Sequence, residues 1–193
     1  MAWLWQRDID DEKRTPHAVM KMKNMLGHRE FRMKSAEKEL KSLGLKAGHN
    51  ILDFGCGSGV YTFAAAKIVG DEGTVHAVDI HPTVIYDIES RALKLGIRNI
   101  DTIYSDLETG IGRGSVDMVI FYDVLRKAEK RRELLSEAHR VLKKSGTLLV
   151  KQSGMKTDRV KDFVLKDGFF NYMGNHGKIM KFGKILGKFT EIS

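Results

Sequence analysis

The sequence predicts an α/β fold in which helices cover both faces of a doubly wound, mostly parallel, seven-stranded sheet. From residue 50 onward, short apolar strand patterns alternate with helical patterns five times, which indicates βαβ units. A glycine turn joins the first strand directly to the first of these helices. Crossovers between parallel strands are right-handed, so an open doubly wound sheet is the natural closure. Two further strand patterns near the C-terminus predict an antiparallel hairpin.

Each element is predicted from its periodicity and its stop signals. Apolar spacings of three and four predict N-terminal helices over 17–26 and 31–44, with Gly44 ending the second. A glycine-rich loop over 109–115 takes the place of a helix after the third strand. The predicted strands cover 51–54, 74–79, 100–104, 116–121, 147–150, 169–173 and 178–182, with the last two joined through 174–177. The helical patterns between and after them lie at 59–69, 85–95, 134–142 and 160–164.

The composition is that of one globular domain. The chain has 193 residues, of which 42% are hydrophobic and 30% charged. Its single cysteine, Cys56, excludes an internal disulfide framework and a cysteine-cluster metal site, and we expect no metal. No stretch approaches the roughly 18 apolar residues of a membrane span. The N-terminus becomes charged at once and does not look like a signal peptide, so we expect a cytoplasmic protein.

The net charge of +8 is unevenly distributed along the chain. Residues 1–50 carry +4, residues 51–120 carry −5 and residues 121–193 carry +9. The acidic middle is a poor place for a nucleic-acid backbone, but it could receive a cationic small molecule. The basic flanks leave open an anionic partner, such as RNA or a membrane surface, or simply a solvated surface.

The glycine turn is the first candidate site. Asp53-Phe54-Gly55-Cys56-Gly57-Ser58-Gly59 runs from a strand into a helix, so that the backbone can approach a ligand closely at the helix N-terminus. The third glycine comes one residue too early for a dinucleotide fingerprint, and no Lys-Ser/Thr pair follows as in a P-loop. The acid at Asp53 would repel phosphates and attract an ammonium group.

Two more acids follow predicted strands. Asp79 ends the second strand, where doubly wound folds place an acid that accepts hydrogen bonds from ribose hydroxyls. Asp106 follows the third strand, where it could reach an adenine edge. Either acid alone could equally cap a helix or a turn. Together with Asp53 and the glycines, at the carboxyl ends of the strands, they favour a ligand site.

The chain resembles a known family through a series of motifs that occur in a fixed order. They are Asp53–Gly59, Val78–Ile80, Ser105–Leu107, Asp117–Leu125 and the run Leu134–Val150. This series resembles the motifs of class I S-adenosylmethionine-dependent methyltransferases, and especially their small ubiquinone/menaquinone-type branch. The resemblance covers about residues 45–152 and implies a Rossmann-like methyltransferase fold.

The resemblance also implies roles for individual residues. The turn of Gly55, Cys56, Gly57 and Gly59 would hold the methionine part of S-adenosylmethionine, and Asp53 would help to orient its ammonium group. Asp79 would bind the ribose, Ile80 would pack on the adenine, and Asp106 with Leu107 would address the adenine edge. Tyr122, at the end of the fourth strand, would line the methyl-transfer site, from which S-adenosylhomocysteine leaves as product.

Methyl transfer from an activated sulfonium needs mainly alignment, and a base only when the acceptor carries a proton. Tyr122 and Asp123 are the candidate catalytic residues, although Tyr122 could instead pack over the cofactor and Asp123 could cap a helix. The position of Cys56 argues against cytosine C5 chemistry. We expect a small-molecule acceptor. An RNA methyltransferase and a non-catalytic cofactor-binding module stay as alternatives.

The domain organisation follows from these assignments. We expect a single methyltransferase domain over 1–193, with an N-terminal helical appendage (1–44), a cofactor-binding core (45–152) and a C-terminal helix and hairpin (153–193). Trp3, Trp5 and the methionine-rich helix after them are interpreted as a lid over the substrate or as a homodimer contact.

Overall fold

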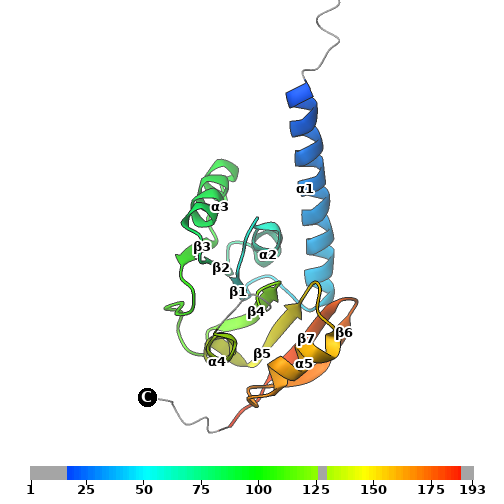
Figure 1. Cartoon of the computed structure of the whole chain (residues 1–193). Coiled ribbons are helices and arrows are strands. Elements are labelled where there is room, and N and C mark those ends of the chain that lie inside the picture. The colour runs from blue at the N-terminus through cyan, green and yellow to red at the C-terminus, as the bar shows by residue number, and fades with distance from the viewer. Residues whose placement is uncertain (1–16, 126–129, 188–193) are drawn as a thin grey trace, which may run out of the picture.

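A computed structural model describes residues 17–125 and 130–187, with side chains of the first helix described from Arg29 onward. Within these residues, seven strands form one sheet in the order β3-β2-β1-β4-β5-β7-β6 (Figure 1). The strands are β1 (Asn50–Phe54), β2 (Thr74–Asp79), β3 (Ile100–Tyr104), β4 (Val116–Tyr122), β5 (Leu142–Lys151), β6 (Phe170–His176) and β7 (Ile179–Lys184). The helices are α1 (His17–Ser42), α2 (Val60–Val69), α3 (Pro82–Leu95), α4 (Arg131–Val141) and α5 (Thr157–Leu165).

The sheet has the predicted mixed topology. The five strands β1 to β5 pair in parallel, and β7 pairs antiparallel with both β5 and β6. The chain moves outward from β1 through β2 to β3, and then returns to place β4 on the other side of β1. The strand order therefore reverses between β1 and β4, and ligands of doubly wound sheets bind beside such a reversal. The predicted doubly wound fold is confirmed.

Apolar side chains bury both faces of the sheet. On one face, α1 and α2 cover β1, β4 and β5 through residues such as Leu40 and Ala65, and α3 packs beside α2. On the other face, α4 and α5 cover the same strands through Leu135 and Val164. Figure 1 shows α1, α2 and α3 on the side of the sheet opposite α4 and α5. Strands buried on both faces explain why β1 and β4 are mostly apolar and do not alternate between apolar and polar residues.

The N-terminal region contains one long helix, and the prediction of two helices is wrong. Backbone hydrogen bonding continues from His17 to Ser42 through Gly27. A glycine costs only about 1 kcal/mol inside a helix, and the i,i+4 pair of Glu30 with Lys34 supports the turns that follow. Gly44 ends the helix as predicted, with a positive φ of 99°. Trp3 and Trp5 lie outside the described residues.

Several predicted boundaries differ from the structure by a few residues, and two of them have a clear structural reason. Leu142 begins β5 and does not end α4, because its backbone already pairs with Val116 of β4. The hairpin turn lies at Gly177 and Lys178, since β6 continues to His176 across a register shift after Tyr172. Among the described residues, no helix is long and apolar enough to span a membrane.

Candidate active site

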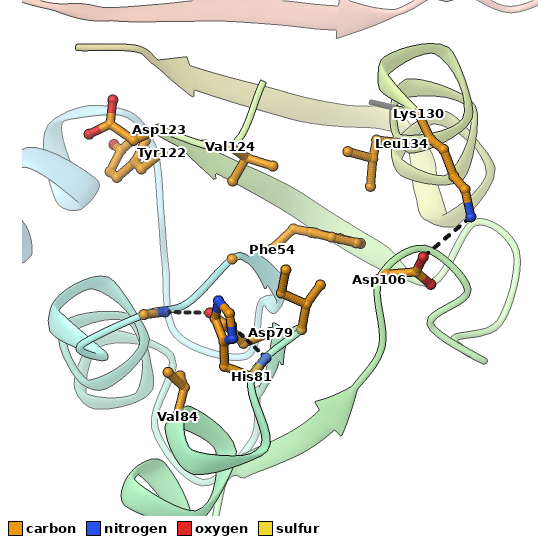
Figure 2. Close-up of a pocket in the computed structure, with 13 residues that line it drawn as sticks. Phe54, Asp79, His81, Val84, Asp106, Tyr122, Asp123, Val124, Lys130 and Leu134 are labelled. Atoms are coloured by element: carbon orange, nitrogen blue, oxygen red, sulfur yellow. Dashed lines mark hydrogen bonds and ion pairs between the residues drawn. The ribbon is translucent and has the colours of Figure 1, made fainter. Parts of the chain in front are cut away.

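A cavity of about 570 Å³ opens at the carboxyl ends of β1, β2 and β4, beside the reversal of strand order. That volume is in the range of small-molecule sites. Figure 2 shows the side chains around it, with Asp79 near the glycine turn, Tyr122 and Asp123 at one end, and Asp106 and Lys130 at the other. The lining residues are Phe54, Gly55, Gly57, Asp79, Ile80, His81, Val84, Asp106, Tyr122, Asp123, Val124, Lys130 and Leu134.

The glycine turn forms one wall of this cavity. The amides of Gly55 and Cys56 both donate to the carbonyl of Val78, at 2.7 and 2.9 Å, which fixes the turn to the end of β2. Gly55, Gly57 and Gly59 all have positive φ, which side chains rarely allow. A Cβ atom at Gly57 would meet only a carbonyl at 3.9 Å. The backbone there is therefore open to a ligand.

Two arginines hold the same turn from outside. Arg29 of α1 and Arg91 of α3 each donate to the carbonyl of Ser58, at 3.0 and 2.9 Å. The Arg91 guanidinium also lies 4.1 Å from the ring centre of Phe63. The N-terminal helix is thus tied directly to the turn, a contact between residues 29 positions apart that sequence periodicity does not indicate.

Asp79 ends β2 and lines the cavity, as expected for a residue predicted to bind a ribose. Its side chain is 7% exposed. One carboxylate oxygen accepts from the Gly57 amide at 3.1 Å and the other from the His81 amide at 3.0 Å. A carboxylate has about four acceptor positions. Two therefore stay available for hydroxyl groups of a ligand, while the other two keep the glycine turn in place.

Asp53 lies beneath the turn and does not line the cavity. Its carboxylate is 3% exposed and accepts a 2.6 Å hydrogen bond from the Thr62 hydroxyl. Burial raises the pKa of Asp53 from 3.8 to about 6, the Thr62 hydrogen bond lowers it, and the nearby Asp79 charge raises it again. Any influence of Asp53 on a ligand's ammonium group therefore acts through the turn.

The side chains at the Asp106 end suit a flat apolar ligand with a polar edge. Ile80 is 52% exposed although it is large and apolar, and it lines the cavity. Asp106 forms a 3.3 Å ion pair with Lys130, and both side chains are mostly exposed. Leu107, its predicted partner, packs against the core beneath α4 and does not line the cavity.

The other end of the cavity carries the two candidate catalytic residues. The Tyr122 hydroxyl is buried and has no hydrogen-bond partner among the described residues. Burial, followed by the neighbouring Tyr61 and Glu39, raises the pKa of Tyr122 well above its usual range. Asp123 has a φ of 58° and accepts hydrogen bonds from Gln152 and Ser153. Its carboxylate therefore joins the ends of β4 and β5.

Cys56 and Gly59 act on the architecture of the turn. The Cys56 side chain is 7% exposed and belongs to the core cluster between α2 and α3. Burial raises the pKa of its thiol far above the usual range. Gly59 starts α2, and its position leaves no room for a Cβ beside Ile88. Cofactor contacts stay predictions for every candidate residue, and Asp53, Cys56, Gly59 and Leu107 do not line the cavity.

Sequence reasoning did not find six of the lining residues. Phe54, His81 and Val124 are direct neighbours of predicted site residues. Phe54 and Val124 lie inside quoted motifs without an assigned role, and His81 directly follows one of them. Val84, Lys130 and Leu134 come from the first turns of α3 and α4, or just before them. Helix N-termini face the carboxyl edge in βαβ units, and that rule is the signal that could have found them.

Comparisons with known proteins identify the family of this chain. A protein family described as "Methyltransferase domain" matches residues 45–185. The aklanonic acid methyltransferase of Streptomyces sp. strain C5 is 42% identical over 74 residues, which are 38% of this chain and 34% of that protein. A ubiquinone/menaquinone biosynthesis C-methyltransferase of Pseudoalteromonas translucida is 26% identical over 143 residues, 73% of this chain and 57% of that protein. The chain spans about a third to three fifths of these relatives.

Solved structures show the same fold. A SAM-dependent methyltransferase from Aquifex aeolicus matches with a TM-score of 0.69 and 23% identity, covering 78% of this chain and 89% of its own. An S-adenosyl-L-methionine-dependent methyltransferase, described as putative, from Methanococcus maripaludis matches with a TM-score of 0.69 and 15% identity, covering 87% and 93%.

The family match extends over most of the chain and includes every residue that lines the cavity. The glycine turn and Asp79 contact each other around that cavity. The chain therefore belongs to the methyltransferase domain family, and the resemblance to class I S-adenosylmethionine-dependent methyltransferases is confirmed.

Proposed function

We propose that this chain transfers a methyl group from S-adenosylmethionine to a small-molecule acceptor. The observation that carries the proposal is the contact between Asp79 and the open backbone of Gly57 at the strand reversal. It places free carboxylate lone pairs beside a backbone that a ligand can approach. Relatives named for aklanonic acid and for ubiquinone and menaquinone biosynthesis support a small organic acceptor.

The cavity residues fit the parts of this cofactor. Asp79 would accept from the ribose hydroxyls, Ile80 would cover one face of the adenine, and Asp106 would lie near the adenine edge. The backbone of Gly55 and Gly57 would lie against the methionine part. The bound cofactor supplies a methyl group already activated on sulfur. The acidic side chains of the cavity suit its positive charge.

The Tyr122 end of the cavity is the proposed side for the acceptor. If the adenosine part lies between Asp79 and Asp106, the methyl-bearing end lies toward β4, where Tyr122 ends the strand. The chain's part in the reaction is to align the acceptor and exclude water there. We propose that Tyr122 faces the acceptor. A cytoplasmic setting and a homodimer stay proposals.

Titration calorimetry with S-adenosylhomocysteine tests cofactor binding. We expect saturable binding by the wild type and at least about tenfold weaker binding by Asp79→Ala, because charged hydrogen bonds to the ligand are lost. Asp71→Ala, in an exposed loop outside the cavity, is the matched control and should bind as the wild type does. No heat with the wild type, or equal affinity in Asp79→Ala, would overturn the assignment.

The acceptor class needs a second measurement. Labelled methyl transfer into cell extract, separated into lipid, small-molecule, RNA and protein pools, should label the small-molecule or lipid pool. Label confined to RNA would contradict the small-molecule proposal, since a phosphate-binding enzyme should also lose affinity steeply with salt.

A further inference from the structure

A polar cluster lies next to the Tyr122 end of the cavity, outside the residues that line it. It joins four elements: Glu39 from α1, Tyr61 from α2, Tyr122 from β4 and Lys151 from β5. Tyr122 belongs both to this cluster and to the cavity wall. The cofactor assignment uses none of the other three residues.

Hydrogen bonds connect the cluster into a chain. The Tyr61 hydroxyl donates to Glu39 Oε2 at 2.7 Å, and Lys151 Nζ donates to the Tyr61 oxygen at 3.2 Å. Lys151 Nζ lies 3.6 Å from the other oxygen of Glu39, with both side chains about a quarter to a third exposed. A hydroxyl between an ammonium group and a carboxylate can accept one proton while it donates another.

Tyr122 lies between this series of hydrogen bonds and the cavity. Its ring packs edge-on against Tyr61 with 4.1 Å between ring centres. The Lys151 ammonium lies 5.4 Å from the Tyr122 ring centre and 5.8 Å from that of Tyr61. The Tyr122 hydroxyl is buried without a partner among the described residues. An unpaired buried hydroxyl is costly, and a polar group of a bound molecule would satisfy it.

The electrostatics of the cluster favour a proton relay. Burial, followed by the hydrogen bond and charge of Glu39, raises the pKa of Tyr61 above its usual range, so Tyr61 stays protonated at neutral pH. Arg32 of α1 lowers that pKa and Asp53 of β1 raises it, and the Lys151 ammonium also faces the Tyr61 oxygen. A neutral phenol can therefore pass a proton to Glu39 without holding a charge itself.

We propose that Glu39, Tyr61 and Lys151 form the proton-accepting and oxyanion-binding group of the acceptor site, so that the acceptor carries an acidic hydroxyl of the phenol or enol kind. The O–H proton of the acceptor passes to the Tyr122 oxygen, the Tyr122 proton passes to the Tyr61 oxygen, and the Tyr61 proton passes to Glu39. The electron pair of that bond stays on the acceptor oxygen, and Lys151 and the Tyr122 hydroxyl stabilise the resulting anion. This inference rests on the proposed function.

The arrangement selects against other acceptors. An amine that is protonated at neutral pH would meet the Lys151 ammonium, and repulsion between like charges disfavours it. A hydroxyl acceptor gains from both partners, because Glu39 takes the proton and Lys151 balances the charge left behind. Glu39 and Tyr61 are positioning and proton-accepting residues, since Tyr122 separates them from the cavity.

The probe for this site is 4-nitrophenol, whose ionised form absorbs visible light and whose neutral form does not. It is titrated into the full chain below its own pKa, with and without S-adenosylhomocysteine. We expect the wild type to bind it as the phenolate. Glu39→Gln should keep the hydrogen bond from Tyr61 and bind the probe as the neutral phenol. Lys151→Gln should bind it about tenfold more weakly, because a charge-assisted contact is lost.

Two controls separate this role from simple attachment of α1. Lys94→Gln, on the exposed face of α3, should behave like the wild type in every titration. The methyl ether 4-nitroanisole has no acidic proton, so its affinity should not depend on Glu39 or Lys151. Thermal unfolding of each variant identifies any that fails to fold. If Glu39→Gln or Lys151→Gln fails, Tyr61→Phe takes its place in the titrations, because it keeps the ring packing and removes only the hydroxyl.

The outcomes are distinguishable from those of the proposed function. If the wild type binds 4-nitrophenol as neutral phenol or not at all, or if Glu39→Gln gives the wild-type spectrum, the relay is wrong. If S-adenosylhomocysteine does not bind, the proposed function fails, while the titrations without it still decide the acceptor site.

Discussion

The hydroxyl of Thr62 donates a 2.6 Å hydrogen bond to the carboxylate of Asp53 beneath the glycine turn. Both side chains are buried. Burial raises the pKa of Asp53 to about 6 in spite of this hydrogen bond. The folded protein therefore holds the Asp53 proton more tightly than the unfolded chain does. Through this pair, the free energy of unfolding depends on pH.

Asp53 should lower the stability of the protein as pH rises through the window between its two pKa values. Between about pH 4 and pH 6 the unfolded chain has released this proton and the folded chain has not, so the free energy of unfolding falls. Above pH 6 the penalty is constant. Asp53→Asn should therefore exceed the wild type at pH 8 by up to about 3 kcal/mol, at 1.36 kcal/mol per unit. Urea unfolding at both pH values measures the difference, and an advantage that does not grow with pH would contradict it.

Thr62→Val is the matching control for this prediction. It keeps the shape of the side chain and removes the donor, so the ionised form of Asp53 loses more than the neutral form. We expect a loss of about 1–3 kcal/mol in the free energy of unfolding at pH 8. At pH 4 the loss should be smaller.

Two glycines of the turn should respond differently to alanine. A Cβ at Gly59 would lie 2.3 Å from Ile88 Cδ1 and 3.0 Å from the Phe63 ring, and both side chains are 1% exposed, so the core around them would have to shift. Gly59→Ala should therefore cost about 2–4 kcal/mol of stability through overpacking and backbone strain. A Cβ at Gly57 has space but faces the cavity, so Gly57→Ala should cost about 1 kcal/mol and weaken S-adenosylhomocysteine binding.

Gly96→Ala is the control for both substitutions. Gly96 follows α3 in the same left-handed conformation as Gly59, with φ 67° and ψ 21°, and has no atom within 4 Å of its Cβ position. It should show the backbone cost alone, with unchanged calorimetric affinity. Equal losses of affinity in Gly57→Ala and Gly96→Ala would remove the backbone of Gly57 from the proposed cofactor site.

The strands and the glycine turn could be predicted from the sequence because their signals are local. The turn Asp53–Gly59 and Asp79 carry their information in residue type and short spacing, and the structure brings Gly57 and Asp79 into contact. The acceptor-side cluster could not be predicted in this way. Tyr61 and Lys151 are 90 positions apart, and only the packing of α2 beside β5 brings them together.

Local signals also misplaced features where tertiary packing decides. The two predicted N-terminal helices left a gap at 27–30, yet backbone hydrogen bonding continues through it and α1 is one helix. Asp53 was predicted to help orient an ammonium group, and the structure adds that its carboxylate is buried beneath the turn. Residue type indicated the chemistry at these positions, and burial determined where it acts.

Arg29 and Arg91 should be energetically coupled because they donate to the same carbonyl of Ser58. Removing one arginine leaves the carbonyl with its other donor, so each single alanine variant should lose about 0.5–1.5 kcal/mol. The double variant leaves it unpaired and should lose at least about 0.5 kcal/mol more than the sum. Denaturant unfolding of the four proteins measures the cycle, with the exposed Arg98→Ala as control. Strict additivity would show that the two contacts are independent.

Substitutions of Asp123 can show whether its carboxylate acts as a base or only holds the ends of β4 and β5 together. Its φ of 58° is tolerated by asparagine better than by alanine, and its carboxylate oxygens accept hydrogen bonds from Gln152 and Ser153. Asp123→Ala should therefore lower the free energy of unfolding by about 2 kcal/mol, and Asp123→Asn by roughly half of that. Since both oxygens are engaged, Asp123→Asn should leave the pH profile of methyl transfer unchanged. If Asp123→Asn is as stable as the wild type but its pH profile of methyl transfer shifts, Asp123 acts as a base. Only a proton-accepting role depends on the charge of the carboxylate and not on its hydrogen bonds.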